Sequence, residues 1–208
     1  EIMGVNNRWC VEFGAWDGKH LSNTWNLIAN GKWSAVLMEG NAKRFEQLLA
    51  NHADHDVNAF NEYVTISGDS RLDLILRRTK APSDFDVLSI DIDGNDWHVW
   101  RSLEGYRPRI VCIEFNPTIS NDVYFVQDPD PAINQGCSLL ALIELGKSKG
   151  YELVATTSWD AIFVPAEFFE SFNISDNSID AMYSPHTRET RLFQGYDGTF
   201  FAAGNLTV

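Results

Sequence analysis

A glycine turn behind a short apolar strand, near the start of the chain, constrains the fold more than any other feature. Residues 9–13 are predicted to form the strand, Gly14 and Gly18 follow it, and a helix is expected to begin near residues 22–24. Gly14 permits a tight turn with positive φ, and Gly18 permits close approach of the backbone to a ligand. This order indicates the opening of a nucleotide-binding α/β unit. Its G-x-x-x-G spacing differs from the G-x-G-x-x-G dinucleotide fingerprint.

The chain then alternates between strand and helix patterns as far as about residue 165. Strands are predicted at 33–39, within 57–65, and at 86–92, 109–115, 151–156 and 160–164, with helices at 41–51, 71–78, 95–103 and 138–149. Five strands separated by helices, followed by a hairpin, predict an α/β fold with a doubly wound, mostly parallel sheet and a C-terminal antiparallel hairpin. We expect one domain over residues 1–167, with the extension 168–208 packing on it as a lid or a homodimer contact.

Ligands of such sheets bind outside the carboxyl ends of the strands, so the residues there are candidate site residues. Glu12 ends the first strand, and Glu39 ends the second, just before Gly40 and Asn41. A carboxylate has two acceptor oxygens and therefore suits the two hydroxyls of a ribose, so Glu39 predicts a nucleoside ligand. An acid here also serves NAD enzymes, and helix capping is the alternative role. Glu62, after the third strand, is expected to flank an adenine.

Acidic and amide side chains gather at the ends of the fourth and fifth predicted strands. They are Asp91, Asp93, Asn95, Asp96, Glu114 and Asn116. One interpretation is that Asp93, Glu114 and Asn116 bind Mg²⁺, because hard oxygen ligands suit this ion. A second is that the carboxylates, Asp91 included, act as general base or bind substrate hydroxyls directly. A third is helix capping by Asn95 or Asp96. His98, early in the following helix, is a further candidate base.

The overall composition excludes several classes of function. A formal net charge of −13 argues against nucleic-acid binding through a broad basic surface. The three cysteines form no C-x-x-C pair, so neither a disulfide framework nor a cysteine zinc site is indicated. No apolar run approaches the roughly 18 residues of a membrane helix, and no signal-peptide pattern is visible. We therefore expect a cytoplasmic protein whose partner is a small-molecule or glycan substrate, and neither nucleic acid nor membrane.

These motifs, in this order, resemble the FkbM-like family of class I S-adenosylmethionine (SAM)-dependent methyltransferases. The matching stretches are 11–15 with Gly18, 22–24, 37–41 followed by 44–45 and Leu48, 86–96, 113–116, 150–154 and 161–164. The resemblance implies a Rossmann-like sheet of seven strands and SAM as methyl donor, with Glu39 on its ribose and Asp91 near its sulfonium. Glu12, Gly14 and Gly18 would line the methionine end. The full predicted cofactor-binding set is Glu12, Gly14, Ala15, Asp17, Gly18, Ser22, Asn23, Thr24, Glu39, Gly40, Asn41, Glu62 and Asp91.

The resemblance also implies an activity, because the family often methylates hydroxyls of sugars or natural products. The sequence therefore predicts an O-methyltransferase in which Asp91, Asp93, Glu114 and His98 are the candidate catalytic residues. The chain departs from the family at two positions: the family often has Asn where this chain has Trp16, and Pro where it has Gly40. Neither difference removes a required charge, but both affect the expected shape of the pocket. Two alternatives stay open: an NAD-dependent oxidoreductase and a non-catalytic nucleoside-binding domain.

Overall fold

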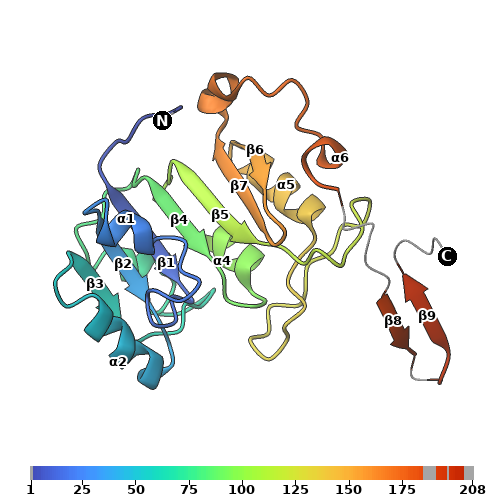
Figure 1. Cartoon of the computed structure of the whole chain (residues 1–208), viewed down its shortest axis with the longest axis horizontal. Helices are drawn as coiled ribbons and strands as arrows, with labels where there is room; N and C mark the ends of the chain where they lie inside the picture. The colour runs from blue at the N-terminus through green and yellow to red at the C-terminus, as the bar shows by residue number, and fades with distance from the viewer. Residues whose placement is uncertain (1, 185–190, 196, 204–208) are drawn as a thin grey trace.

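A seven-stranded sheet forms the centre of the molecule in a computed structural model, which describes residues 2–184, 191–195 and 197–203. Its strands are β1 (Trp9–Phe13), β2 (Ser34–Met38), β3 (Val57–Phe60), β4 (Val87–Ile90), β5 (Ile110–Glu114), β6 (Tyr151–Thr156) and β7 (Asp160–Pro165). The spatial order is β3-β2-β1-β4-β5-β7-β6, parallel except where β7 pairs with β5 and β6. The predicted fold class, a doubly wound sheet with a C-terminal antiparallel hairpin, is confirmed (Figure 1).

Helices cover the sheet, as its parallel strands require. They are α1 (Trp25–Ala29), α2 (Ala42–Asn51), α3 (Leu72–Leu76), α4 (Asp96–Ser102) and α5 (Leu139–Ser148). Alternate strand residues enter two separate apolar clusters, since successive side chains point to opposite faces. Val36 and Met38 of β2 join the cluster that includes Trp100 of α4. Leu37 joins the second cluster with Ile28 of α1 and Leu48 of α2. Trp97 and Trp100 thus belong to the core.

Residues 168–184 of the C-terminal extension pack on the domain. A 3-10 helix, η1 (Ala166–Phe172), and a short α6 (Ile179–Met182) lead to Tyr183, whose ring lies 5.0 Å from that of Phe115. Beyond it, β8 (Arg191–Gln194) and β9 (Phe200–Ala203) form a separate antiparallel pair, which stands apart from the main sheet in Figure 1. The lid and dimer roles of this segment stay predictions, and part of it lies outside the described residues.

A search of the described residues for membrane-spanning helices finds none of sufficient length and apolar character.

Candidate functional site

Gly14 and Glu39, two of the predicted site residues, lie at the switch point of the sheet, where β1 lies between β2 and β4. Gly14 follows β1 with φ +72° and crosses directly over the end of β4. A Cβ added to Gly14 would stand 1.8 Å from the carbonyl oxygen of Asp91, so only glycine fits. Glu39 follows β2 at the neighbouring strand end. Ligands of doubly wound sheets bind at this place.

Glu12, at the end of β1, is buried and holds the segment that leads into α1. Its carboxylate accepts hydrogen bonds from Ser22 Oγ (2.6 Å), Thr24 Oγ1 (2.6 Å) and the Asn23 backbone N–H (2.9 Å). Burial raises the pKa of Glu12, although these donors oppose the shift. The Asn23 amide also donates to Ser89 Oγ at 3.1 Å, which ties the turn to β4. Four of the predicted cofactor-binding residues therefore form one network beneath the glycine turn.

Glu39 joins the loops that follow β1 and β2. It is only 5% exposed, and its two carboxylate oxygens accept from the backbone N–H groups of Trp16 (2.9 Å) and Asn41 (2.7 Å). The side chain of Asn41 in turn accepts from two backbone N–H groups in the first turn of α2, so Asn41 is the N-cap of this helix. These donors fix the direction of the Glu39 carboxylate before any ligand arrives.

The remaining predicted cofactor residues around the first loop have local partners. A Cβ at Gly18 would meet the ring of His52 at 2.5 Å, and His52 Nε2 lies 2.9 Å from the Gly18 carbonyl oxygen. The turn therefore rests on the end of α2. Asp17 accepts from the N–H groups of Lys19 and His20. Ala15 is buried, and its N–H donates to the carbonyl of Met38.

Two predicted residues lie on the β3 side of the site. A Cβ at Gly40 would meet the ring of Tyr63 at 2.3 Å, so the glycine makes room for this largely exposed ring. Glu62 forms an ion pair with Arg78 at 2.6 Å. Its carboxylate is thus held on the side of α3, and its contact with an adenine stays a prediction.

Three carboxylates meet beyond the ends of β4 and β5, as the sequence predicts for Asp93 and Glu114. Oxygens of Asp91, Asp93 and Glu114 all lie within 4.8 Å of one another. Burial and the neighbouring acids, chiefly Asp91, raise the pKa of Glu114 to about 8. Burial and the acids Asp96 and Asp93 raise the pKa of Asp91 to about 6. A group of acids at this density favours a bound proton or a cation.

An open cavity of about 320 Å³ adjoins the carboxylates. It is lined by Asp93, Asp96, Glu114, Phe115, Asn116, Pro117, Asn134, Gln135, Gly136 and Trp159. The carboxylate of Asp96, which is buried, accepts the backbone N–H groups of Ile92 and Gly94, one on each oxygen. Asn116 is occupied as well, since its amide donates to the carbonyl of Gln135 and accepts from Thr118. Asp91 is therefore better placed than Asn116 as a third oxygen ligand of a divalent ion.

His98 of α4 points to a loop beside the cavity. Its Nε2 lies 2.8 Å from the carbonyl oxygen of Gln127. This places His98 in a positioning contact, and its role as a base stays a prediction. Sequence reasoning missed Gln127, Asn134, Gln135 and Trp159, which lie in stretches without helical or strand periodicity. The exposed Trp159, in the turn between β6 and β7, carried the only visible signal: an apolar ring in a polar turn.

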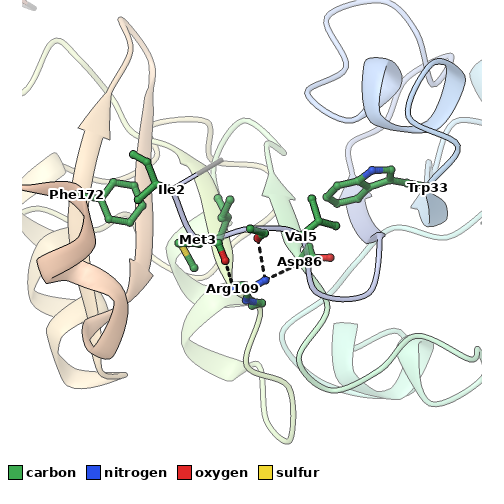
Figure 2. A pocket seen from close by; sticks show the side chains of 9 residues that line it. Ile2, Met3, Val5, Trp33, Asp86, Arg109 and Phe172 are labelled. Atoms are coloured by element: carbon green, nitrogen blue, oxygen red, sulfur yellow. Dashed lines mark hydrogen bonds and ion pairs between the residues drawn. The ribbon is translucent and has the colours of Figure 1, made fainter.

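A second cavity, of about 350 Å³, lies at the opposite edge of the sheet (Figure 2). Its floor is the ion pair of Arg109 and Asp86, 3.0 Å apart, and Ile2, Val5 and Phe172 give it an apolar wall. Arg109 also donates to the carbonyls of the N-terminal segment. This cavity lies at the amino ends of β4 and β5, away from the switch point.

The chain is similar to known proteins in its structure. No family model and no curated protein matches the chain. One similar solved structure is the CMeT domain of the citrinin polyketide synthase, with 11% identity over 76% of this chain and 46% of that chain and a TM-score of 0.48. Another is the bifunctional kinase-methyltransferase WbdD, with 12% identity over 76% of this chain and 34% of that chain and a TM-score of 0.45. A third is a SAM-dependent methyltransferase from Methanosarcina mazei, with 11% identity over 77% of this chain and 94% of that chain and a TM-score of 0.45. The chain thus spans less than half of the first two. At these values the likeness identifies neither the cofactor nor the substrate of this chain.

Proposed function

We propose that the protein is a SAM-dependent methyltransferase that methylates a hydroxyl of a sugar, a glycan or a small natural product. One observation carries most of the proposal: an oriented acid, Glu39, and a separate acidic cavity flank the same switch point. The first suits the ribose of a nucleoside, and the second suits an acceptor hydroxyl beside Asp93 and Glu114. The sequence motifs that resemble FkbM-like methyltransferases provide independent support for SAM as the nucleoside.

The residues at the end of β2 fit a nucleoside. Each carboxylate oxygen of Glu39 accepts one backbone N–H group, from Trp16 or from Asn41. A carboxylate oxygen has two lone-pair sites, so each keeps one for a ribose hydroxyl. Because backbone donors hold the carboxylate in place, little side-chain entropy is lost when the ligand binds.

The chemistry at the cavity follows from its carboxylates. Bound SAM would supply a methyl group that is already activated by the sulfonium. The protein has to orient the acceptor hydroxyl and accept its proton. Glu114, whose pKa is raised to about 8, suits this role, because a general base works best when its pKa lies near the operating pH. Asp93, on the same cavity wall, can hold the hydroxyl in place.

Paired variants test this division of roles. Glu39→Ala should weaken binding of S-adenosylhomocysteine (SAH) at least about tenfold, because two hydrogen bonds to a charged group are lost. Asp93→Asn should leave SAH binding intact and abolish methyl transfer. Asn is chosen because Asp93 has φ +59°, a conformation that Asn tolerates. Calorimetry measures the binding, and transfer of labelled methyl to methyl α-D-glucoside or catechol measures the activity.

The exposed Glu46 of α2 provides the control, since Glu46→Ala removes a carboxylate from the helix that follows Glu39 and should change neither readout. Equal loss of SAH affinity in Glu39→Ala and Asp93→Asn would overturn the assignment of roles.

A thermal-shift titration tests the cofactor itself. A ligand that binds only the folded protein raises the unfolding midpoint, so SAM and SAH should raise it while NAD should not. Mg²⁺ stays a prediction, carried by the oxygens of Asp91, Asp93 and Glu114, and an additional shift with Mg²⁺ would support it. A shift with NAD alone would favour the oxidoreductase alternative.

A further inference from the structure

The long connection between β5 and α5 forms one wall of the acidic cavity. It runs over residues 115–138 and supplies Asn134, Gln135 and Gly136 to the cavity lining. Irregular connections of this length are uncommon in compact domains and usually serve function. Its second half is closed at the base by a β-bridge between Val126 and Cys137. We call residues 127–136 the Gln127 loop.

Apolar packing does not hold the Gln127 loop. Residues 128–136, all of them described by the structure, are exposed or half-buried. Gln127 differs, since it is only 2% exposed. A loop without an apolar core of its own depends on hydrogen bonds for its shape.

The side chain of Gln127 occupies the centre of the loop and uses both ends of its amide. Its Oε1 accepts the backbone N–H groups of Gln135 (2.9 Å) and Gly136 (2.8 Å). Its Nε2 donates to the carbonyl of Ile133 (2.8 Å), with longer contacts to the carbonyl of Asp130 (3.3 Å) and to Asn95 Oδ1 (3.2 Å). A buried amide with this many partners fixes the backbone around it.

The same residue ties the loop to the end of β4. Asn95, which receives one Gln127 hydrogen bond, precedes α4, and His98 of that helix contacts the Gln127 carbonyl. A Cβ on Gly94 would stand 2.6 Å from the carbonyl of Ile133, so the loop lies directly against the segment that carries Asp93. The position of Asn134 and Gln135 relative to the acids is therefore set through Gln127.

We infer that Gln127 is a positioning residue for the methyl acceptor: its buried carboxamide holds the loop wall of the cavity and so determines which acceptors fit beside Asp93 and Glu114. The inference rests on the proposed function for the identity of the cavity as the acceptor site. It also implies that the residues around Glu39 bind SAM whether or not the Gln127 loop keeps its shape.

Two variants of Gln127 separate its donor and acceptor halves. Gln127→Ala removes both halves. Gln127→Glu is nearly isosteric and keeps the acceptor for the Gln135 and Gly136 N–H groups, but it turns a carboxylate toward the carbonyls of Ile133 and Asp130. Gln47→Ala, on the exposed face of α2, is the matched control. Calorimetry with SAH shows first that each variant is folded and keeps the cofactor half of the site.

Hydrogen exchange and kinetics then give the result. Amide exchange of residues 128–136 should accelerate in Gln127→Ala and less in Gln127→Glu. The KM for methyl α-D-glucoside or catechol, whichever the wild type methylates, should rise by about tenfold in Gln127→Ala, the effect of losing roughly one good hydrogen bond, while the KM for SAM stays within about twofold. A purely structural role would lower kcat through lost active enzyme and leave both KM values unchanged.

The possible failures are distinguishable. Unchanged exchange in Gln127→Ala, or an unchanged acceptor KM in an active variant, overturns the inference and leaves the proposed function intact. If the wild-type protein transfers methyl to neither compound, the proposed acceptor class is wrong. The inference about acceptor selection is then overturned together with it.

Discussion

Burial and neighbouring acids change the titration of a single carboxylate, that of Glu114. It ends β5, partly buried, with Asp91 and Asp93 beside it, and these acids together with burial raise its pKa to about 8. At this carboxyl the folded protein therefore holds a proton that the unfolded chain releases between pH 4.5 and about 8. The contribution of Glu114 to stability should fall as the pH rises through this window. Glu114→Gln should flatten the fall and raise the unfolding midpoint above pH 8.

Thermal melts between pH 5 and about 9 measure this slope. The exposed variant Glu46→Gln should keep the wild-type slope. A wild-type slope in Glu114→Gln as well would show that Glu114 does not carry the proton.

Among the elements, helix α2 connects the loops that follow β1 and β2. It begins at the Asn41 cap beside Glu39 and ends at His52, packed beneath Gly18. His52 has His55 (Nδ1 to Nδ1 3.3 Å) and Asp17 near it, and burial lowers its pKa below the ordinary value. Since the unfolded chain takes up this proton first, the contribution of His52 to stability should fall as the pH drops below about 6.5. His52→Gln, which keeps a donor for the Gly18 carbonyl, should remove this part of the fall.

The measurement is the unfolding midpoint at pH 5.5 and 7.5 for the wild type and His52→Gln. Exposed His20, which also follows the glycine turn, gives the matched control His20→Gln. An identical acid-side fall in all three proteins would exclude His52 as its origin.

At the scale of the whole molecule, the N-terminal segment is attached to the sheet through one buried ion pair. Asp86 accepts the backbone N–H groups of Asn6, Asn7 and Arg8, and Arg109 binds Asp86 and the carbonyls of Met3 and Gly4. Arg109→Met should lower the free energy of unfolding by about 3 kcal/mol, because it leaves a buried carboxylate without its cation.

Urea unfolding with an unchanged m-value would measure this loss. The exposed pair of Arg107 and Glu167 supplies the comparison, since Arg107→Met should cost less than about 1 kcal/mol. Similar losses in both variants would contradict the view that burial sets the value of the Arg109 pair.

The hydrophobicity of short segments was enough to predict the central strands and the residues at their ends. The strands β1, β2, β4 and β5 are apolar on both faces, so composition alone marks them as central strands. The glycine turn and the acids at strand ends follow from these assignments, because parallel strands end at one edge of the sheet. Glu114 of β5 lies close to Asp91 and Asp93, which both follow β4, for this reason.

The use made of each polar group depended on contacts between residues far apart in the chain, which only the tertiary structure decided. Glu12 was predicted to line the methionine end of the cofactor, and the structure adds that its carboxylate accepts hydrogen bonds from Ser22, Thr24 and the Asn23 backbone. Its contact with the cofactor stays a prediction. Gln127 lies in an aperiodic stretch, and its buried side chain accepts the N–H groups of residues that line the cavity. Periodicity reports which face of an element is buried, whereas a hydrogen bond depends on the approach of two specific atoms. The sequence therefore determined the sheet and the edge where the acids gather, and tertiary packing decided which of those groups keep free lone pairs for a ligand.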